Sequence, residues 1–582
     1  MIRRLTLACF LLYVGCGKDG GHPDSQSGGA NGATGGSTGS GGARPGFGGG
    51  AGSPAGAAGS GGSAITGGAP GSGGAVETGG QPGSGGTIER GGTTGSTTGG
   101  TAGTAASGGA IGSGGNGGAS STAISSSLGA IYSGVPLLDT SGNLVNAHGP
   151  GFIKVGGLYY MVGEQRSGAN DSYSGATINA EDTFTGVSMY STPDFVSWTF
   201  VGTVVRPIAG TILSPPYYGE RPKILYNASA KEYFIYIKML NYVGNPPDYV
   251  GDYAILTSAN IAGPYSYRGN LNLSGANDFE VFQDSDGSQY LARTGGKLYK
   301  FSSDGLTVGS SIVTVQGGEG PSLYKAGNIY FWQSSQGTYW HSNDNSYSSA
   351  TSLTGPWTNH GYFCPSGSDT WQSQDSAVVP VTGTAGTTYI YVGDRWVNGA
   401  LPASTLVMQP FTLSGSTESI PTYNPVWSLD VTAGTWKAVT PAGVSINDST
   451  VGTGLNQFTY SGVWNSVSLN GGFDGDAHVS SSAGATATVP FTGSQILLYS
   501  AYDESSGIMG VTLCDSAGVA LTPELQVSLR YDAPAAGNYL VYASPVMPNG
   551  SYRLKVRVTG LKDWYSTGTK CTIDRVLIVG GS

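Results

Sequence analysis

The feature of this chain that most restricts its fold is a hairpin pattern that recurs five times between residues 124 and 436. Each unit consists of a strand, a turn rich in Gly, Asn or Ser, and a second strand rich in aromatic residues. The units are residues 152–164, 224–238, 281–293, 323–334 and 378–396. A hairpin of this kind cannot cover its own apolar faces, so each unit needs neighbours of the same kind.

A second repeat supports the same architecture. Residues 258–265 and 349–357 both begin with Ser-Ala and end with Gly-Pro and an aromatic residue, and residues 191–198 are a looser copy. A closed ring of four-stranded blades explains both repeats and leaves few exposed strand edges. We therefore expect an all-β chain in which residues 123–436 form a five-bladed β-propeller.

Residues 437–582 have a different texture and predict a second domain. Short strands alternate with regular turn signals, and no helical periodicity is present. The clearest strands are residues 495–501, 507–514, 539–544, 552–559 and 572–579. About 140 residues of this kind are typical of a β-sandwich of the jelly-roll type.

The first 122 residues predict export and a tether. Arg3-Arg4 precede a short apolar run, and Val14-Gly15-Cys16 is similar to the lipobox of bacterial lipoproteins, although Tyr13 stands where Leu is usual. Residues 1–16 are thus a lipoprotein-type signal peptide, with an ordinary cleaved secretory peptide as the alternative. Residues 17–122 are almost wholly Gly, Ser, Thr, Ala and Pro, which predicts a disordered linker. We expect a protein that is extracellular or anchored to the outer membrane.

The composition narrows the class of ligand. The chain has 582 residues with 100 Gly, 34 Tyr and 10 Trp, only 11% are charged, and the net charge is −10. Such a surface suits neutral, hydrogen-bonding ligands such as sugars, whereas nucleic acid needs grouped Lys and Arg. No apolar run after the signal approaches the ~20 residues of a membrane span, so the lipid anchor is the only membrane contact predicted. We expect a monomer.

The cysteines predict neither a metal site nor a cofactor. Cys364, Cys514 and Cys571 follow the lipobox, and their spacing is not that of metal ligands. A disulfide between Cys514 and Cys571 is open in an oxidising compartment. We predict no cofactor. Asp474-Gly475-Asp476 could join a structural calcium site, because Ca²⁺ prefers hard oxygen ligands, but a plain turn is favoured.

One carboxylate stands out within the expected propeller. Glu319 lies in the turn Gly318-Glu319-Gly320-Pro321, at the head of the fourth hairpin unit. Enzymes that cleave sugars often present their proton donor on such a strand end. Taken alone, the pattern also fits a surface Glu in a turn.

Several motifs together resemble glycoside hydrolase family 43, and in particular its exo-β-1,3-galactanase branch. They occur in the family's order and span residues 130–430. The motifs are Asn146-Ala147-His148-Gly149, Tyr160-Met161-Val162-Gly163-Glu164, Gly219-Glu220-Arg221-Pro222-Lys223, Asp278 before Val281-Phe282-Gln283-Asp284, Glu319-Gly320-Pro321, Trp371-Gln372-Ser373-Gln374 and Gly393-Asp394-Arg395-Trp396.

The resemblance implies a role for each catalytic residue of an inverting mechanism. Glu319 is the general acid, and Asp278 is the carboxylate that raises its pKa and holds its orientation. Most of the family places an Asp base in the first blade, where this chain has His148. The galactanase branch instead uses a Gln, matched by Gln374, acting as the base or only positioning water. Glu220 is a further candidate that would bind sugar hydroxyls or orient the water.

The resemblance also implies sugar contacts. Glu164 and Tyr242 match positions that contact galactose, and Trp396 would stack on the sugar ring or pack within a blade. His148 is either a polar group on the pocket floor or a hydrogen-bonded core residue. We expect Arg221 and Lys223 to steady Glu220 by ion pairing. Strand alternation should turn Asp375 away from the face that carries Gln374.

The C-terminal region resembles galactose-binding-like jelly rolls attached to carbohydrate enzymes. Trp464, Trp564 and Tyr565 are its candidate sugar-stacking residues, with core packing as the alternative for each.

Three functions remain open from the sequence. The leading one is an exo-acting β-1,3-galactanase on arabinogalactan-type polysaccharide. The second is an α-L-arabinofuranosidase or β-xylosidase of the same family, which the absence of a first-blade Asp disfavours. The third is a non-catalytic glycan-binding propeller, which the joint presence of Glu319, Asp278, Glu220 and Gln374 disfavours.

Overall fold

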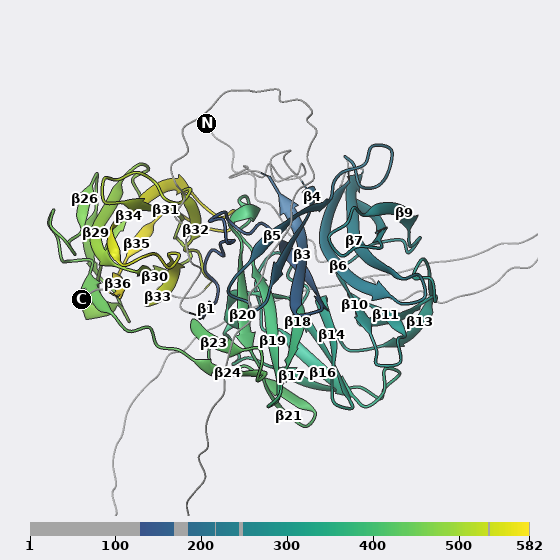
Figure 1. Cartoon of the computed structure of the whole chain (residues 1–582). Helices are drawn as coiled ribbons and strands as arrows, with labels where there is room; N and C mark the ends of the chain where they lie inside the picture. Colours follow the sequence, from purple (N-terminus) through teal and green to yellow (C-terminus); the bar gives the residue numbers. More distant parts are fainter. Residues whose placement is uncertain (1–128, 168–183, 216, 244–247, 533–535, 581–582) are drawn as a thin grey trace, which may run out of the picture. The chain divides into compact units, whose positions relative to one another are not determined.

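The computed structural model describes residues 129–167, 184–215, 217–243, 248–532 and 536–580 (Figure 1). The predicted signal peptide and Cys16 lie outside these residues, and so does the predicted linker. Within the described ranges, no helix is long and apolar enough to cross a membrane.

Five antiparallel sheets form the predicted five-bladed propeller (Figure 1). The first two strands of each sheet coincide with one of the five hairpin units of the sequence. The first blade holds β2 (His148–Val155), β3 (Leu158–Arg166), β4 (Phe184–Thr192) and β5 (Thr199–Val205), and the second holds β6 (Tyr218–Asn227), β7 (Glu232–Val243), β8 (Asp248–Ser258) and β9 (Ser266–Asn270). The third holds β10 (Phe279–Gln283), β11 (Gln289–Arg293), β12 (Lys297–Phe301) and β13 (Val308–Thr314), and the fourth holds β14 (Glu319–Ala326), β15 (Ile329–Ser335), β16 (Ser346–Ala350) and β17 (Thr358–Tyr362).

The fifth blade departs from the expected four strands. Among the described residues it has three, β18 (Gln374–Thr382), β19 (Thr387–Arg395) and β20 (Thr405–Pro410). The chain then makes the hairpin of β21 (Thr412–Ser414) and β22 (Thr417–Ser419). The next strand, β23 (Val426–Asp430), pairs with β1 (Ile131–Tyr132) on one edge and with β24 (Thr435–Ala438) on the other, and not with β20.

The first strands of the blades line the ring and place the functional residues. Neighbouring first strands contact one another, and β18 contacts β2, so the ring is closed. Four of these strands carry a register shift close to a predicted site residue: His148, Glu220, Glu319 and Gln374. A bulge inserts an extra residue and re-aims the side chains beside it, as is common next to active sites.

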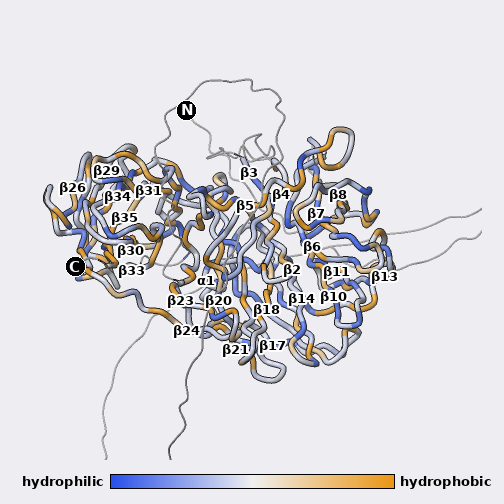
Figure 2. The backbone as a smooth tube through the Cα atoms, in the orientation of Figure 1, coloured by the Kyte–Doolittle hydropathy of each residue, from blue (hydrophilic) through white to orange (hydrophobic). Residues whose placement is uncertain are grey.

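A second domain follows as a β-sandwich. Its four-stranded sheet has β25 (Val444–Asn447), β36 (Arg575–Val579), β30 (Gln495–Tyr502) and β33 (Ala536–Ala543). Its five-stranded sheet has β26 (Thr459–Ser461), β29 (Thr486–Gly493), β34 (Gly550–Leu561), β31 (Ile508–Asp515) and β32 (Leu525–Ser528), and a smaller sheet has β27 (Asn465–Ser468), β28 (Asp476–Ser480) and β35 (Cys571–Ile573). One core cluster, including Phe491, Leu513 and Val556, fills the space between them. Figure 2 shows apolar residues dispersed among polar ones along the strands of both domains, as expected for half-buried sheets.

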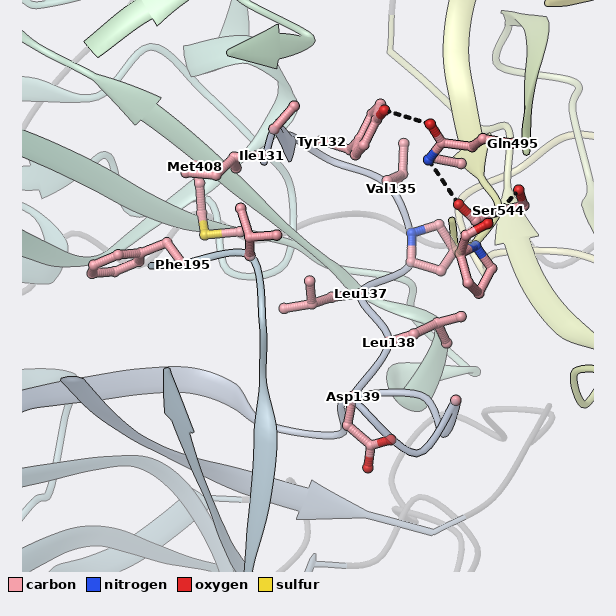
Figure 3. Close-up of a pocket in the computed structure, with 16 residues that line it drawn as sticks. Ile131, Tyr132, Val135, Leu137, Leu138, Asp139, Phe195, Met408, Gln495 and Ser544 are labelled. Carbon is pink, nitrogen blue, oxygen red and sulfur yellow. Dashed lines mark hydrogen bonds between the residues drawn. The ribbon is translucent and has the colours of Figure 1, made fainter. Parts of the chain in front are cut away.

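The segment that precedes the first blade joins the two domains. Val135 and Val426 share one buried cluster with Leu497 and Leu577 of the sandwich. Figure 3 shows the pocket along this segment, where the Tyr132 hydroxyl donates a hydrogen bond of 2.8 Å to Oε1 of Gln495. Buried apolar side chains therefore link propeller and sandwich.

The three described cysteines carry free thiols, so the disulfide between Cys514 and Cys571 does not form. All three cysteine residues are buried. Asp474 and Asp476 both accept a hydrogen bond from Nδ2 of Asn447, at 3.2 and 3.0 Å. No group of three or more His, Cys, Asp or Glu in the described ranges is arranged to hold a metal ion.

Candidate active site

The pocket at the centre of the ring gathers most of the predicted residues. Its lining includes Glu164, Glu220, Asp278, Glu319, Gln374 and Trp396. They come from all five blades, with Asp278 directly before the first strand of the third, and they are far apart in the sequence. The meeting of first strands at the propeller axis brings them together.

Glu319 is the first residue of β14 and is half-buried. Its Oε1 accepts hydrogen bonds from the backbone N–H of Thr338 at 3.0 Å and from Nε2 of Gln374 at 3.3 Å. Burial raises the pKa of Glu319 to about 7, and the charge of Asp278 adds to this increase. A carboxyl group of this kind retains its proton near neutral pH, as a general acid must.

Asp278 is held as a charged carboxylate. Its oxygens lie 3.3 Å from Nε of Arg221 and 2.7 Å from Nζ of Lys238, and Oδ2 also accepts the Gly320 N–H at 3.1 Å. Burial alone would raise the pKa of Asp278, but these two cations hold it well below its ordinary value. The bond to Gly320 ties this negative charge to the residue next to Glu319.

The cation that pairs with Glu220 differs from the prediction. Lys238 Nζ lies 2.6 Å from Oε2 of Glu220 and so bridges Glu220 and Asp278. Arg221 instead pairs with Asp278, and Lys223 lies 3.4 Å from Glu280. A β-bulge between Glu220 and Lys223 explains part of the difference, because it turns the side chains that follow Glu220 toward other blades.

Gln374 opens β18 and is buried, with its amide orientation fixed by its neighbours. Oε1 accepts the indole N–H of Trp396 at 2.9 Å and a guanidinium N–H of Arg221. Both partners are donors only, so the oxygen must face them. Nε2 faces the other way and donates to Glu319 and, at 3.2 Å, to the carbonyl of Tyr339.

Asp375 points away from the pocket, as strand alternation predicts. Its Oδ1 accepts a hydrogen bond of 2.9 Å from the Ser322 hydroxyl in the neighbouring blade. Burial raises the pKa of Asp375 to about 8. This residue is absent from the lining of the pocket.

Glu164 and His148 face each other across the first two strands of blade one. Glu164 lines the pocket and pairs with Arg166, and burial raises its pKa. His148 is buried, and burial lowers its pKa to about 3, so it is neutral. Neither ring nitrogen has a hydrogen-bond partner among the described residues, and His148 is absent from the lining of the pocket, so it is neither the hydrogen-bonded core histidine of the prediction nor a lining residue.

The similarity to known proteins agrees with this geometry. Residues 145–395 match the family model described as glycosyl hydrolases family 43. The propeller is a family 43 domain. The protein is accordingly a glycoside hydrolase. None of the curated proteins matches the chain.

Solved structures extend the likeness over the sandwich. An exo-β-1,3-galactanase from Phanerochaete chrysosporium with galactose is 26% identical, covers 77% of this chain and 100% of its own, and has a TM-score of 0.56. A variant of that enzyme with β-1,3-galactotriose is 25% identical with the same coverage and a TM-score of 0.55.

The family 43 domain contains pocket residues that the sequence argument missed. Tyr339 and Trp340 come from the loop after β15, and Trp340 packs edge-on against Trp396 at 5.0 Å between ring centroids. Tyr339 is 80% exposed. Two adjacent aromatic residues in a Gly/Ser/Asn-rich loop were the available signal. Lys238 was missed because a lone Lys in a strand says nothing about its partners.

The roles predicted for Trp396 and Tyr242 are not decided by the described residues. Trp396 lines the pocket and hydrogen-bonds to Gln374, which is compatible with both sugar contact and blade packing. Tyr242 lies in β7, and its side chain is outside the described part of the structure.

The three candidate aromatic residues of the sandwich do not form one platform. Trp464 packs against the sandwich core. The backbone N–H of Trp564 donates to the carbonyl of Asn398 in the propeller at 3.1 Å. The Tyr565 ring lies 3.8 Å from the ring of His341, between centroids. Two of the three thus serve the contact with the family 43 domain.

Proposed function

We propose that the protein is an exo-β-1,3-galactanase that releases galactose from arabinogalactan-type polysaccharide by an inverting acid/base mechanism. The observation that carries the proposal is the Glu319 carboxyl, whose pKa lies near 7 beside the charged Asp278 in the central pocket. The similarity to exo-β-1,3-galactanases, 25–26% identical over 77% of the chain, supports this substrate class.

In this mechanism Glu319 donates its proton to the glycosidic oxygen as the bond to the anomeric carbon breaks. Asp278 favours the protonated form of Glu319 by like-charge repulsion and remains ionised because Arg221 and Lys238 neutralise it. The Thr338 N–H and the Asp278–Gly320 bond hold the acid in place.

On the opposite face a water molecule attacks the anomeric carbon. Gln374 is proposed to position that water, because its oxygen is occupied by two donors and its Nε2 faces the pocket. Inverting pairs stand about 6.5–9.5 Å apart. Glu319 and Gln374 are 3.3 Å apart, so a bound sugar has to separate them.

The remaining pocket groups are proposed to recognise the sugar. Glu164 and Glu220 offer carboxylate acceptors for its hydroxyls, and Trp396, with Trp340, offers an apolar ring face. Tyr242 is a further proposed contact. We propose that the chain acts outside the cell or on the outer membrane, which rests on its N-terminal sequence alone. We also propose that it acts as a monomer.

The test is to incubate the purified protein with linear β-1,3-galactan, an aryl α-L-arabinofuranoside and an aryl β-xyloside. We expect galactose release from the galactan, with kcat lowered about 10²–10⁴-fold in Glu319→Gln. Glu504→Gln, an exposed Glu of the sandwich, is the control and should leave kcat unchanged.

Turnover of the arabinofuranoside or xyloside alone would replace the galactanase proposal, and binding without turnover of any glycan would favour a glycan-binding propeller. Proton NMR of the first product reports its anomer. A β-anomer would contradict inversion.

A further inference from the structure

Three propeller segments that build the pocket wall also contact the sandwich. The segments are residues 336–345, 368–374 and 396–399, and they carry Trp340, Gln374 and Trp396. In each, the contact with the sandwich lies within six residues of the pocket residue.

The segment before Gln374 has two direct bonds to the sandwich. The Tyr531 hydroxyl donates to the carbonyl of Ser368 at 3.0 Å, and Nε2 of Gln372 donates to the carbonyl of Arg530 at 2.7 Å. Tyr531 and Arg530 follow strand β32. Gln372 is buried, and its bond to Arg530 is part-buried.

Between these two bonds lies a strained turn. Asp369, Thr370, Trp371 and Gln372, labelled α1 in Figure 2, have φ values of 50, 51, 56 and 58°. The left-handed conformation costs about 1–2 kcal/mol for each non-glycine residue. Four in succession persist only where the surroundings determine the conformation, and such strain gathers at functional sites.

Arg395 clamps the same turn. It donates to the carbonyls of Trp371 at 2.9 Å and Gln372 at 3.4 Å, and to the hydroxyl of Tyr502 in the sandwich at 3.1 Å. The sandwich therefore touches the turn directly through Tyr531 and Arg530 and indirectly through Arg395.

The other two segments are tied in the same way. His341, next to Trp340, packs against Tyr565 and lies 3.5 Å from Oδ2 of Asp532. The N–H of Asn398, two residues after Trp396, donates to Asp563 at 2.7 Å.

We infer that the sandwich positions Gln374 by holding the left-handed turn 369–372, with Tyr531 and the Arg530 carbonyl as its positioning groups. The expected effect on turnover rests on the proposed function, in which Gln374 positions the attacking water molecule. The sandwich is then a structural part of the active site, whatever else it binds.

The test compares full-length variants that lose one hydrogen bond. Tyr531→Phe removes the bond to Ser368, and Gln372→Met removes the bond to Arg530 from the propeller side. Tyr552→Phe is the matched control, because its hydroxyl donates at 2.9 Å to Pro548 within the sandwich itself. Thermal unfolding checks that each variant is folded.

The first readout is hydrogen–deuterium exchange of residues 368–374, which needs no activity. We expect about fivefold faster exchange there in Tyr531→Phe and Gln372→Met, on the order of one lost hydrogen bond, and no change in Tyr552→Phe. Unchanged exchange in both test variants, or an equal increase in the control, would overturn the inference.

The second readout is turnover of β-1,3-galactotriose. We expect kcat to fall about fivefold in Tyr531→Phe with KM nearly unchanged, because the sugar contacts of Glu164 and Glu220 remain. A changed KM at constant kcat would overturn the inference. If the wild-type protein turns over no galactan, the proposed function fails, and exchange still decides whether the sandwich holds the turn.

Discussion

Replacing Asp278 with Asn should shift the alkaline limb of the pH–rate profile to lower pH. The pKa of Glu319 is raised to about 7 by burial first and by the charge of Asp278 second. Activity that needs protonated Glu319 is present below this pKa and is lost as the pH rises through it. Without the charge of Asp278, the neighbouring cations Arg221 and Lys238 would lower the pKa of Glu319 further.

The size of the shift follows from the geometry. Asp278 is hydrogen-bonded to the N–H of Gly320, the residue next to Glu319. A charged group at about 4–6 Å moves a pKa by about 1–3 units, and burial, which the substitution leaves in place, is the larger cause here. We therefore expect a decrease of about one unit. At pH 7 the protonated fraction of Glu319 would fall from about one half to about one tenth.

The assay is kcat/KM for β-1,3-galactotriose at half-unit intervals between pH 4 and 9, which reports the pKa of the free enzyme. Asp286→Asn, an exposed Asp in the turn of the same blade, is the control and should leave the profile unchanged. An alkaline limb of Asp278→Asn that stays in place or moves to higher pH would refute the reasoning, even if the overall rate falls.

Two further predictions concern stability. Lys238→Met leaves the carboxylates of Glu220 and Asp278 buried without their shared cation, so the free energy of unfolding, measured by chemical denaturation, should fall by about 3–5 kcal/mol. The control Lys297→Met, at an exposed site, should change it by less than about 0.5 kcal/mol. Equal effects of the two substitutions would contradict the ion-pair argument. Burial raises the pKa of Glu418 to about 7, so its contribution is full below its unfolded pKa near 4.5 and is lost as the pH rises through 7. The thermal midpoint of Glu418→Gln should therefore fall less between pH 5 and 9 than that of the wild type, and parallel curves would count against this.

The repeat pattern was sufficient to predict the propeller. Each of the five hairpin units became the first two strands of a blade, because alternation and turn residues are local properties that a strand pair obeys wherever it is placed. The fifth blade was less predictable. It has three strands because β23 pairs with β1, which is far away along the chain, and not with β20.

The candidate site, too, has a part that the sequence predicts and a part that it does not. Glu319, Asp278, Glu220 and Gln374 could be located from their motifs, and the structure brings all four to one pocket. Their partners could not, since Lys238 reaches two carboxylates that are 18 and 40 residues away along the chain.

The sequence by itself determined the elements, the type of domain and the residues able to do acid/base chemistry, because these follow from local periodicity and side-chain chemistry. The tertiary structure decided the protonation and orientation of those residues. Burial and the charge of Asp278 keep the proton on Glu319, and two donors from separate segments, Arg221 and Trp396, orient the amide of Gln374. Both effects depend on distances across the ring, which no local pattern encodes.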